Sequence, residues 1–229
     1  MKAVSIVILM GACFTARAHD VITTKVTYAR EISRLFEKSC VACHREGGSS
    51  FSLTTYEQAR PWAKSIKEEV LERRMPPWGA VKGFGSFKND QGLTQEQMEL
   101  ISDWVEGGAP EGDPALLPKL GKPAAKPSNV RSTRAELVVN GSVRLKQPAL
   151  VEGIRASTLL EGTSVQVIAR RPDGSFEPLI WLYHYQPRFD HPYFFRSALA
   201  LPAGTEIETF PAKSGTVALL LTSTLKPAR

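Results

Sequence analysis

The spacing of hydrophobic residues divides the chain into a first half with helical periodicity and a second half with strand-like runs. In the first half Ile32, Leu35 and Phe36 recur three and four positions apart, which predicts an amphipathic helix over residues 28–39. Capping sequences and apolar spacing predict later helices that begin at residues 54–57, run from 61 to 74, and span 93–106. The first half is therefore expected to be all-α.

The second half contains short runs of β-branched and aromatic residues. These runs predict strands at residues 136–139, 164–169, 179–183, 206–208 and 216–221. Turn sequences such as Asn140-Gly141 separate them, and no helical period lies between them. Many short strands of this kind are typical of an antiparallel sandwich. The predicted fold is thus multidomain, α then β, with a small antiparallel β-sandwich over residues 131–229.

A stretch rich in proline and lysine separates the two halves at residues 114–130. Its composition is typical of a semi-rigid, solvent-exposed linker. A basic strip that docks an acidic partner is the alternative, and we favour the linker. The predicted boundaries are 26–113 for the helical domain, 114–130 for the linker and 131–229 for the β-domain.

The first eighteen residues have the features of a secretory signal peptide. Lys2 precedes an apolar run, and Ala16-Arg17-Ala18 has the small residues of a cleavage site. The run is little more than half of the roughly 20 residues that span a bilayer, so we expect no transmembrane span. Cleavage after Ala18 predicts periplasmic localisation. Cleavage before Cys13 would instead leave a lipidated cysteine that tethers the protein to a membrane.

Composition narrows the possible functions. The chain has 229 residues, 42% of them hydrophobic and 23% charged, as in ordinary globular proteins. Its formal charge of +6 falls to +4 without residues 1–18, which contain Lys2, Arg17 and no acidic residue, and this balance is too weak to predict nucleic-acid binding. Three cysteines are too few for a disulfide framework or a four-cysteine zinc site. Without Cys13, the two that remain belong to one short motif.

The sequence Cys40-Val41-Ala42-Cys43-His44 is the C-x-x-C-H signature of covalent haem c attachment. Two thiols three positions apart on a helical turn can add to the two vinyl groups at one edge of a porphyrin, and the imidazole that follows then faces the iron. A thioredoxin-like pair expects a βαβ setting, and a zinc site needs further cysteine or histidine ligands. Neither is present nearby. The motif predicts one covalently attached haem c.

The second axial ligand must come from the few remaining methionines and histidines. The candidates are Met75, Met98, His19, His184 and His191. Met98 lies within the predicted helix 93–106 and is interpreted as a core residue. Met75 follows a helix and precedes Pro76-Pro77, which end that helix and hold the thioether on a stiff loop. We therefore favour Met75 as ligand over a loop residue that merely packs on the core.

Five aromatic residues could line a haem crevice or simply belong to the core. They are Trp62, Trp78, Phe84, Phe87 and Trp104.

The first half resembles class I c-type cytochrome domains. Residues 40–44, 53–56, 60–62, 75–78 and 104–110 are similar to the cytochrome domain that bacterial exported proteins carry before a domain resembling copper type II, ascorbate-dependent monooxygenases. The resemblance covers residues 26–113. It implies His44 as proximal iron ligand, Met75 as distal ligand, and Cys40 and Cys43 as thioether attachments. With both axial positions filled, outer-sphere electron transfer is favoured over oxygen activation.

The second half resembles part of the copper monooxygenase domain more weakly, at residues 171–179, 185, 193 and 201–207. Where that family places a His-x-His pair for copper, this chain has Ser157-Thr158-Leu159. A copper centre needs several imidazole or thioether ligands, and His184 and His191 do not fall at that place. The β-domain is therefore expected to be a non-catalytic relative that serves docking or structure.

The sequence as a whole predicts an exported monohaem c-type cytochrome. It would carry single electrons to and from redox partner proteins in the periplasm, and it would not be an enzyme. The first alternative is a copper-dependent monooxygenase component whose haem supplies electrons to copper, to which His19 could contribute if cleavage falls after Ala18. The second alternative is a haem-based redox or gas sensor, in which Met75 would have to leave the iron.

Overall fold

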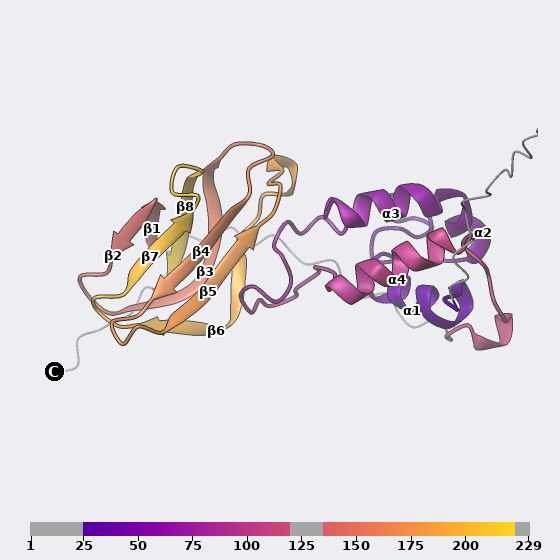
Figure 1. Ribbon diagram of the computed structural model, residues 1–229, viewed down its shortest axis with the longest axis horizontal. Helices are drawn as coiled ribbons and strands as arrows, with labels where there is room; N and C mark the ends of the chain where they lie inside the picture. The colour runs from indigo at the N-terminus through magenta and orange to yellow at the C-terminus, as the bar shows by residue number, and fades with distance from the viewer. Residues whose placement is uncertain (1–24, 120–134, 223–229) are drawn as a thin grey trace, which may run out of the picture.

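In a computed structural model the chain forms a helical unit and a β unit that lie end to end (Figure 1). The structure describes residues 25–119, which we call the helical unit, and residues 135–222, which we call the β unit. The predicted signal peptide, which contains Cys13, and His19 just after it lie outside the described residues. Most of the predicted linker, whose start is a 3-10 turn at Pro114–Leu116, lies outside them as well.

Short helices build the helical unit, as predicted. They are a π-helical turn at Tyr28–Ile32, α1 (Ser33–Ser39), α2 (Tyr56–Ala59), a 3-10 turn at Arg60–Trp62, α3 (Ala63–Leu71) and α4 (Gln95–Glu106). Their apolar stripes meet in one core that contains Phe36, Ile101 and Trp104. In the described part of the chain, no helix has both the length and the hydrophobicity that a membrane span requires.

Side-chain caps fix where two of these helices begin. Thr94 Oγ1 accepts a hydrogen bond from Gln97 N at 3.2 Å, and Gln97 Oε1 accepts one from Thr94 N at 2.9 Å, which is the predicted capping box of α4. The start of α2 is one residue later than predicted. Its cap is Thr55, paired with Gln58, because the Thr54 hydroxyl donates to the Gln58 side chain instead.

We expect Thr94→Ala to lower the free energy of unfolding by about 1 kcal/mol, because backbone N–H groups at the start of α4 lose their acceptor. Urea denaturation of the purified protein measures this change. Gln95→Ala, on the exposed side of the same turn, is the control and should change the free energy by less than about 0.5 kcal/mol. Equal effects of the two substitutions would contradict the role of the cap.

The β unit consists of two antiparallel four-stranded sheets, which fit the predicted sandwich. Its strands are β1 (Ala135–Asn140), β2 (Ser142–Arg144), β3 (Ala149–Leu159), β4 (Val165–Arg170), β5 (Phe176–Leu182), β6 (Tyr193–Leu201), β7 (Glu206–Phe210) and β8 (Gly215–Leu221). One sheet has the order β1-β8-β3-β6 and the other has the order β2-β7-β4-β5. Strands β2, β3 and β6 were not predicted from the sequence.

Alternating side chains of the two sheets enter a single hydrophobic core. Along β4, Val165, Val167 and Ala169 are buried while the residues between them are not. Buried residues of β3, β6 and β8 join the same cluster from the other sheet. The strands at one side of this core, β5 and β6, are each the outermost strand of their sheet.

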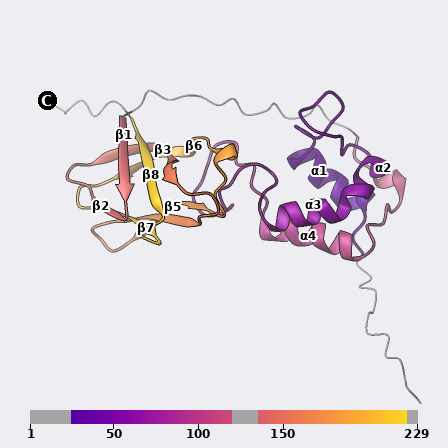
Figure 2. The same cartoon turned by 90° about the horizontal axis from the view of Figure 1, so that it is seen from above.

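A segment of the helical unit completes that side of the β unit. Residues 78–88, which form the middle of the connection between α3 and α4, run out to the β unit and back, as both views show (Figures 1 and 2). Ala80 pairs with Leu182 at the end of β5, and Phe87 pairs with Phe195 of β6. Trp78, Ala80 and Phe87 are buried in the β core, not in the helical core. The predicted helical domain therefore contains a piece of the β core.

Candidate haem site

The C-x-x-C-H motif forms a tight turn that continues α1. Cys40 N donates to Phe36 O at 2.8 Å, and the amides of Cys43 and His44 both donate to Cys40 O, at 3.1 and 2.9 Å. The two cysteines are free and half-buried, and Cys40 packs against the helical core. The backbone thus holds both thiols and the imidazole on one helical turn, which is the arrangement that the motif predicts.

The ring of His44 is oriented by a carbonyl group. His44 Nδ1 lies 3.1 Å from Phe51 O, and because a carbonyl can only accept, Nδ1 must carry the proton in this hydrogen bond. The other nitrogen, Nε2, then has a free lone pair, as an iron ligand requires. The Phe51 ring meets the imidazole edge to face at 4.8 Å. The sequence does not indicate this role of Phe51, because every residue type has a backbone carbonyl that can accept a hydrogen bond.

The loop after the motif returns closely to it. Ser50 N donates to Cys43 O at 3.3 Å and Leu53 N donates to His44 O at 3.0 Å. A Cβ atom on Gly48 would lie 2.3 Å from Cys43 O, so the close return of this loop requires a glycine at that position.

Burial, with a smaller contribution from the neighbouring Cys43, raises the pKa of the Cys40 thiol to about 12. A thiol with so high a pKa has little thiolate at neutral pH, which is the opposite of a reactive C-x-x-C pair of the thioredoxin kind.

Met75 lies on a short irregular segment between α3 and the β unit. The amides of Arg74 and Met75 both donate to Glu69 O, at 2.9 and 3.1 Å, and these bonds close the end of α3. Trp78 N donates to Pro76 O at 2.8 Å and closes the next turn. The Met75 side chain packs against the same helical core that Cys40 contacts. The chain at Met75 is therefore non-helical, and hydrogen bonds close the turns on both sides of the methionine.

Met98 is buried within α4, with 3% of its surface exposed, and belongs to the helical core. This agrees with its interpretation as a core residue.

The five aromatic residues that could line a haem crevice lie in different parts of the structure. Trp104 is fully buried in the helical core, and Trp78 and Phe87 are buried in the β core. Phe84 contacts Trp181 of β5 edge to face. Trp62 is 45% exposed and stacks on Phe51 at 4.5 Å, so it lies next to the group that orients His44.

Trp78 lies between Met75 and the β unit in the chain and contacts residues of both units. It lines a small pocket together with Met75 and Met98. Its carbonyl oxygen accepts a hydrogen bond from the Tyr193 hydroxyl, and burial, with a smaller contribution from Asp190, raises the pKa of Tyr193 above its ordinary value, so this hydroxyl stays protonated. Its indole Nε1 is buried and has no hydrogen-bond partner among the described residues. A bound group with an acceptor oxygen could use this donor.

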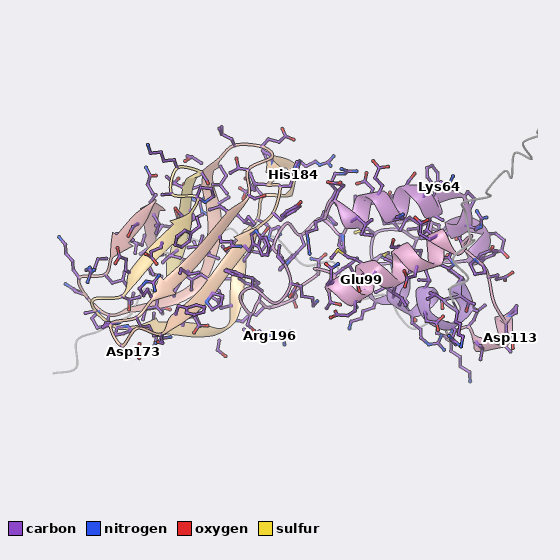
Figure 3. All side chains as sticks on the ribbon, in the orientation of Figure 1. Lys64, Glu99, Asp113, Asp173, His184 and Arg196 are labelled. Atoms are coloured by element: carbon purple, nitrogen blue, oxygen red, sulfur yellow. The ribbon has the colours of Figure 1, made fainter. Side chains whose placement is uncertain are left out.

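The two histidines of the β unit lie in different settings. His184 follows β5 at a positive φ of 48° and is exposed (Figure 3). His191 contacts the rings of Trp78, at 4.8 Å, and Tyr193, at 4.2 Å, with both pairs of rings tilted. Among residues 25–119 and 135–222, no three histidine, cysteine, aspartate or glutamate side chains are grouped as a metal ion would require.

Comparison with known proteins identifies the first unit. Residues 29–109 match the family model "Cytochrome c", and this match supports a c-type cytochrome domain in that part of the chain. Such a domain carries covalently bound haem c and supports a role as a haem-binding electron carrier. No match was found among curated proteins or among solved structures.

The residues present fit this cofactor. Two thiols on one turn, an imidazole with its Nδ1 proton engaged and a thioether beside the helical core are the kinds of donor that a six-coordinate haem c would use. The matched range ends at residue 109 and includes segment 78–88, so the family match covers residues that pack in the β core.

Proposed function

We propose that this protein is an exported monohaem c-type cytochrome that carries single electrons. Cys40 and Cys43 form the thioether bonds to one haem, His44 is the proximal iron ligand and Met75 is the distal ligand. The β unit has no catalytic role of its own. Redox proteins of the periplasm are the partners, with a membrane tether through Cys13 as the alternative to a free periplasmic form.

The observation that carries this proposal is the hydrogen bond from His44 Nδ1 to the Phe51 carbonyl. It selects the tautomer whose Nε2 can bind iron, and it does so next to two thiols on one turn. Haem c supplies a one-electron couple between ferric and ferrous iron when it is bound. His44 and Met75 would hold the iron from its two faces, so substrates would find no open coordination site and electrons would pass without bond formation.

The chemistry of the chain's own residues favours a high reduction potential. A thioether ligand and the apolar core against which Met75 packs both stabilise the ferrous state compared with a bis-histidine site in a polar setting. The hydrogen bond to Phe51 holds the imidazole in a fixed orientation.

Haem attachment and metal content test this proposal. We expect the protein, produced with a haem c maturation system, to retain one haem per chain after denaturation and acid-acetone extraction. Cys40→Ser combined with Cys43→Ser should release all of it under the same treatment. Ser39→Ala, which leaves both thiols in place, is the control and should retain the haem.

Metal analysis of the same samples separates the electron carrier from the copper monooxygenase. We expect iron equal to the haem content and no stoichiometric copper after anaerobic purification and reconstitution. Haem that is extracted from the unaltered protein, or copper bound in equal proportion to iron, would contradict the proposal.

A further inference from the structure

Residues 73–88, which include Met75 and which we call the Met75 segment, are attached to the β unit on both sides of the methionine. On the N-terminal side the Arg73 guanidinium lies over the Tyr183 ring, with 5.9 Å from Cζ to the ring centroid. On the C-terminal side Trp78 is 5% exposed and lies in the β core, and its carbonyl accepts the hydrogen bond from Tyr193. Only Arg74, Met75, Pro76 and Pro77 lie between these two attachments.

Backbone hydrogen bonds continue the attachment along the edge of one sheet. Val81 N donates to Trp181 O at 2.8 Å, and Tyr183 N donates to Gly79 O at 3.1 Å. Because β5 is an outermost strand, the backbone N–H and C=O groups on its outer side have no partner strand within its own sheet. The bonds to residues 79 and 81 use these groups of β5 and of the residue that follows it.

The same segment then pairs with the edge of the other sheet. Lys88 N donates to Phe194 O at 2.7 Å, and Arg196 N donates to Ser86 O at 2.8 Å. Arg196 is labelled in Figure 3 at this edge. Phe87 stacks on Phe195 at 5.3 Å and contacts Tyr193 at 5.6 Å. The segment therefore joins the outermost strands of both sheets.

We propose that the β unit positions Met75 and thereby controls how often the sixth coordination position of the haem iron opens. Tyr193 is the central positioning residue, because its hydroxyl holds the carbonyl of the residue that follows Met75-Pro76-Pro77. The inference rests on the proposed function, since it assigns a role toward the proposed iron ligand. It gives the β unit a specific task inside the electron carrier: it keeps the thioether on the iron and other ligands off it.

Two proline residues restrict how far Met75 can move relative to Trp78. Pro76 and Pro77 each have a fixed φ, so the chain between Met75 and Trp78 has few rotatable bonds. For the backbone at Met75 to move away, either Trp78 must leave the β core or the turn closed by the bond from Trp78 N to Pro76 O must open. Loss of the Tyr193 hydrogen bond makes the first movement easier.

The rate at which an added ligand replaces Met75 measures this opening. Imidazole binds ferric haem through nitrogen after the bond from iron to sulfur breaks, with no change of oxidation state, and at saturating imidazole the observed rate equals the opening rate. We expect Tyr193→Phe to raise this rate about fivefold, since the loss of one buried hydrogen bond corresponds to about 1 kcal/mol. Tyr56→Phe removes a similar bond, from Tyr56 Oη to Ala109 O in the helical unit, and should leave the rate unchanged.

A pair of glycines provides a second, independent test. Gly83 and Gly85 have positive φ values of 90° and 87°, so an alanine at either position has the same backbone strain. A Cβ atom on Gly85 would lie 2.4 Å from Leu179 O of β5, whereas nothing lies within 4 Å of one on Gly83. We expect Gly85→Ala to raise the opening rate on the order of tenfold or more, and Gly83→Ala to have a much smaller effect.

A control in the β unit separates positioning from general stability. Val217 is buried on β8, which pairs with β1 and β3 and not with the Met75 segment. Val217→Ala should destabilise the β unit and leave the opening rate unchanged below its unfolding transition. If it raises the rate as much as Tyr193→Phe does, the effect is one of stability and the proposal is wrong.

The outcomes distinguish the two proposals. A ferric protein without the sulfur-to-iron charge-transfer band overturns the proposed function, whatever Tyr193 does. A band that depends on Met75, with opening rates in Tyr193→Phe and Gly85→Ala equal to that of the unaltered protein, leaves the electron carrier intact and overturns the positioning role.

Discussion

Replacing Met75 with alanine is expected to abolish the sulfur-to-iron charge-transfer band of the ferric protein and to open the ferrous iron to carbon monoxide. Alanine has no donor atom, so the sixth position becomes vacant or takes water. The reduction potential should fall on the order of a tenth of a volt or more, because axial ligands set haem potentials over a range of about 0.8 V. Optical spectroscopy, carbon monoxide titration and spectroelectrochemistry measure these three changes.

Met98→Leu is the matched control for this experiment. Met98 is the other methionine of the helical unit, it lines the same small pocket as Met75, and it is buried in α4. Leucine keeps the volume and removes the sulfur, so stability should change by less than about 1.5 kcal/mol. The band and the potential should stay as they are. A band that survives in Met75→Ala and disappears in Met98→Leu would reverse the assignment of the ligand.

Phe87→Ala should destabilise the β unit strongly, although Phe87 belongs to the region that matches the cytochrome c family. Its ring is 2% exposed and packs on Phe195 and Tyr193 in the β core. Truncation of a buried phenylalanine costs about 3–5 kcal/mol, from lost burial and from the cavity that remains. Urea denaturation followed by circular dichroism, together with hydrogen exchange of amides in β5 and β6, measures the effect.

Phe84→Ala provides the comparison for Phe87→Ala within the same segment. Phe84 is only half-buried and contacts a single ring of β5. Its truncation should cost about 1 kcal/mol and leave exchange in β6 unchanged. Equal and small effects of both substitutions would mean that segment 78–88 does not belong to the β core.

Much of the fold could be predicted because local patterns agree with the final structure. The capping box at Thr94 and the apolar spacing of α1 and α4 are local signals, and the structure contains each element. Strand β3 was missed because Gly153 and the register shift beside it interrupt its alternation. Strand β6 was missed because its aromatic residues come directly after Pro192 and are followed by the polar pair Arg196-Ser197.

The docking of segment 78–88 on the β unit could not be predicted for a different reason. Trp78 and Phe87 are the residue types that a haem crevice and a hydrophobic core both use, and the local sequence does not say which core they join. The pairing partners, in β5 and β6, are about a hundred residues further along the chain, and long-range pairing has no local signature. The sequence does reveal the candidate ligands, since C-x-x-C-H and Met-Pro-Pro restrict chemistry and backbone together.

The central claim is that His44 and Met75 both bind the iron of one haem c. X-ray absorption at the iron edge of the ferric protein tests it most directly, because the scattering distinguishes sulfur from nitrogen and oxygen neighbours. We expect one sulfur neighbour together with nitrogen neighbours, and loss of the sulfur in Met75→Ala with its retention in Met98→Leu. A first shell of nitrogen or oxygen alone in the unaltered protein would contradict it.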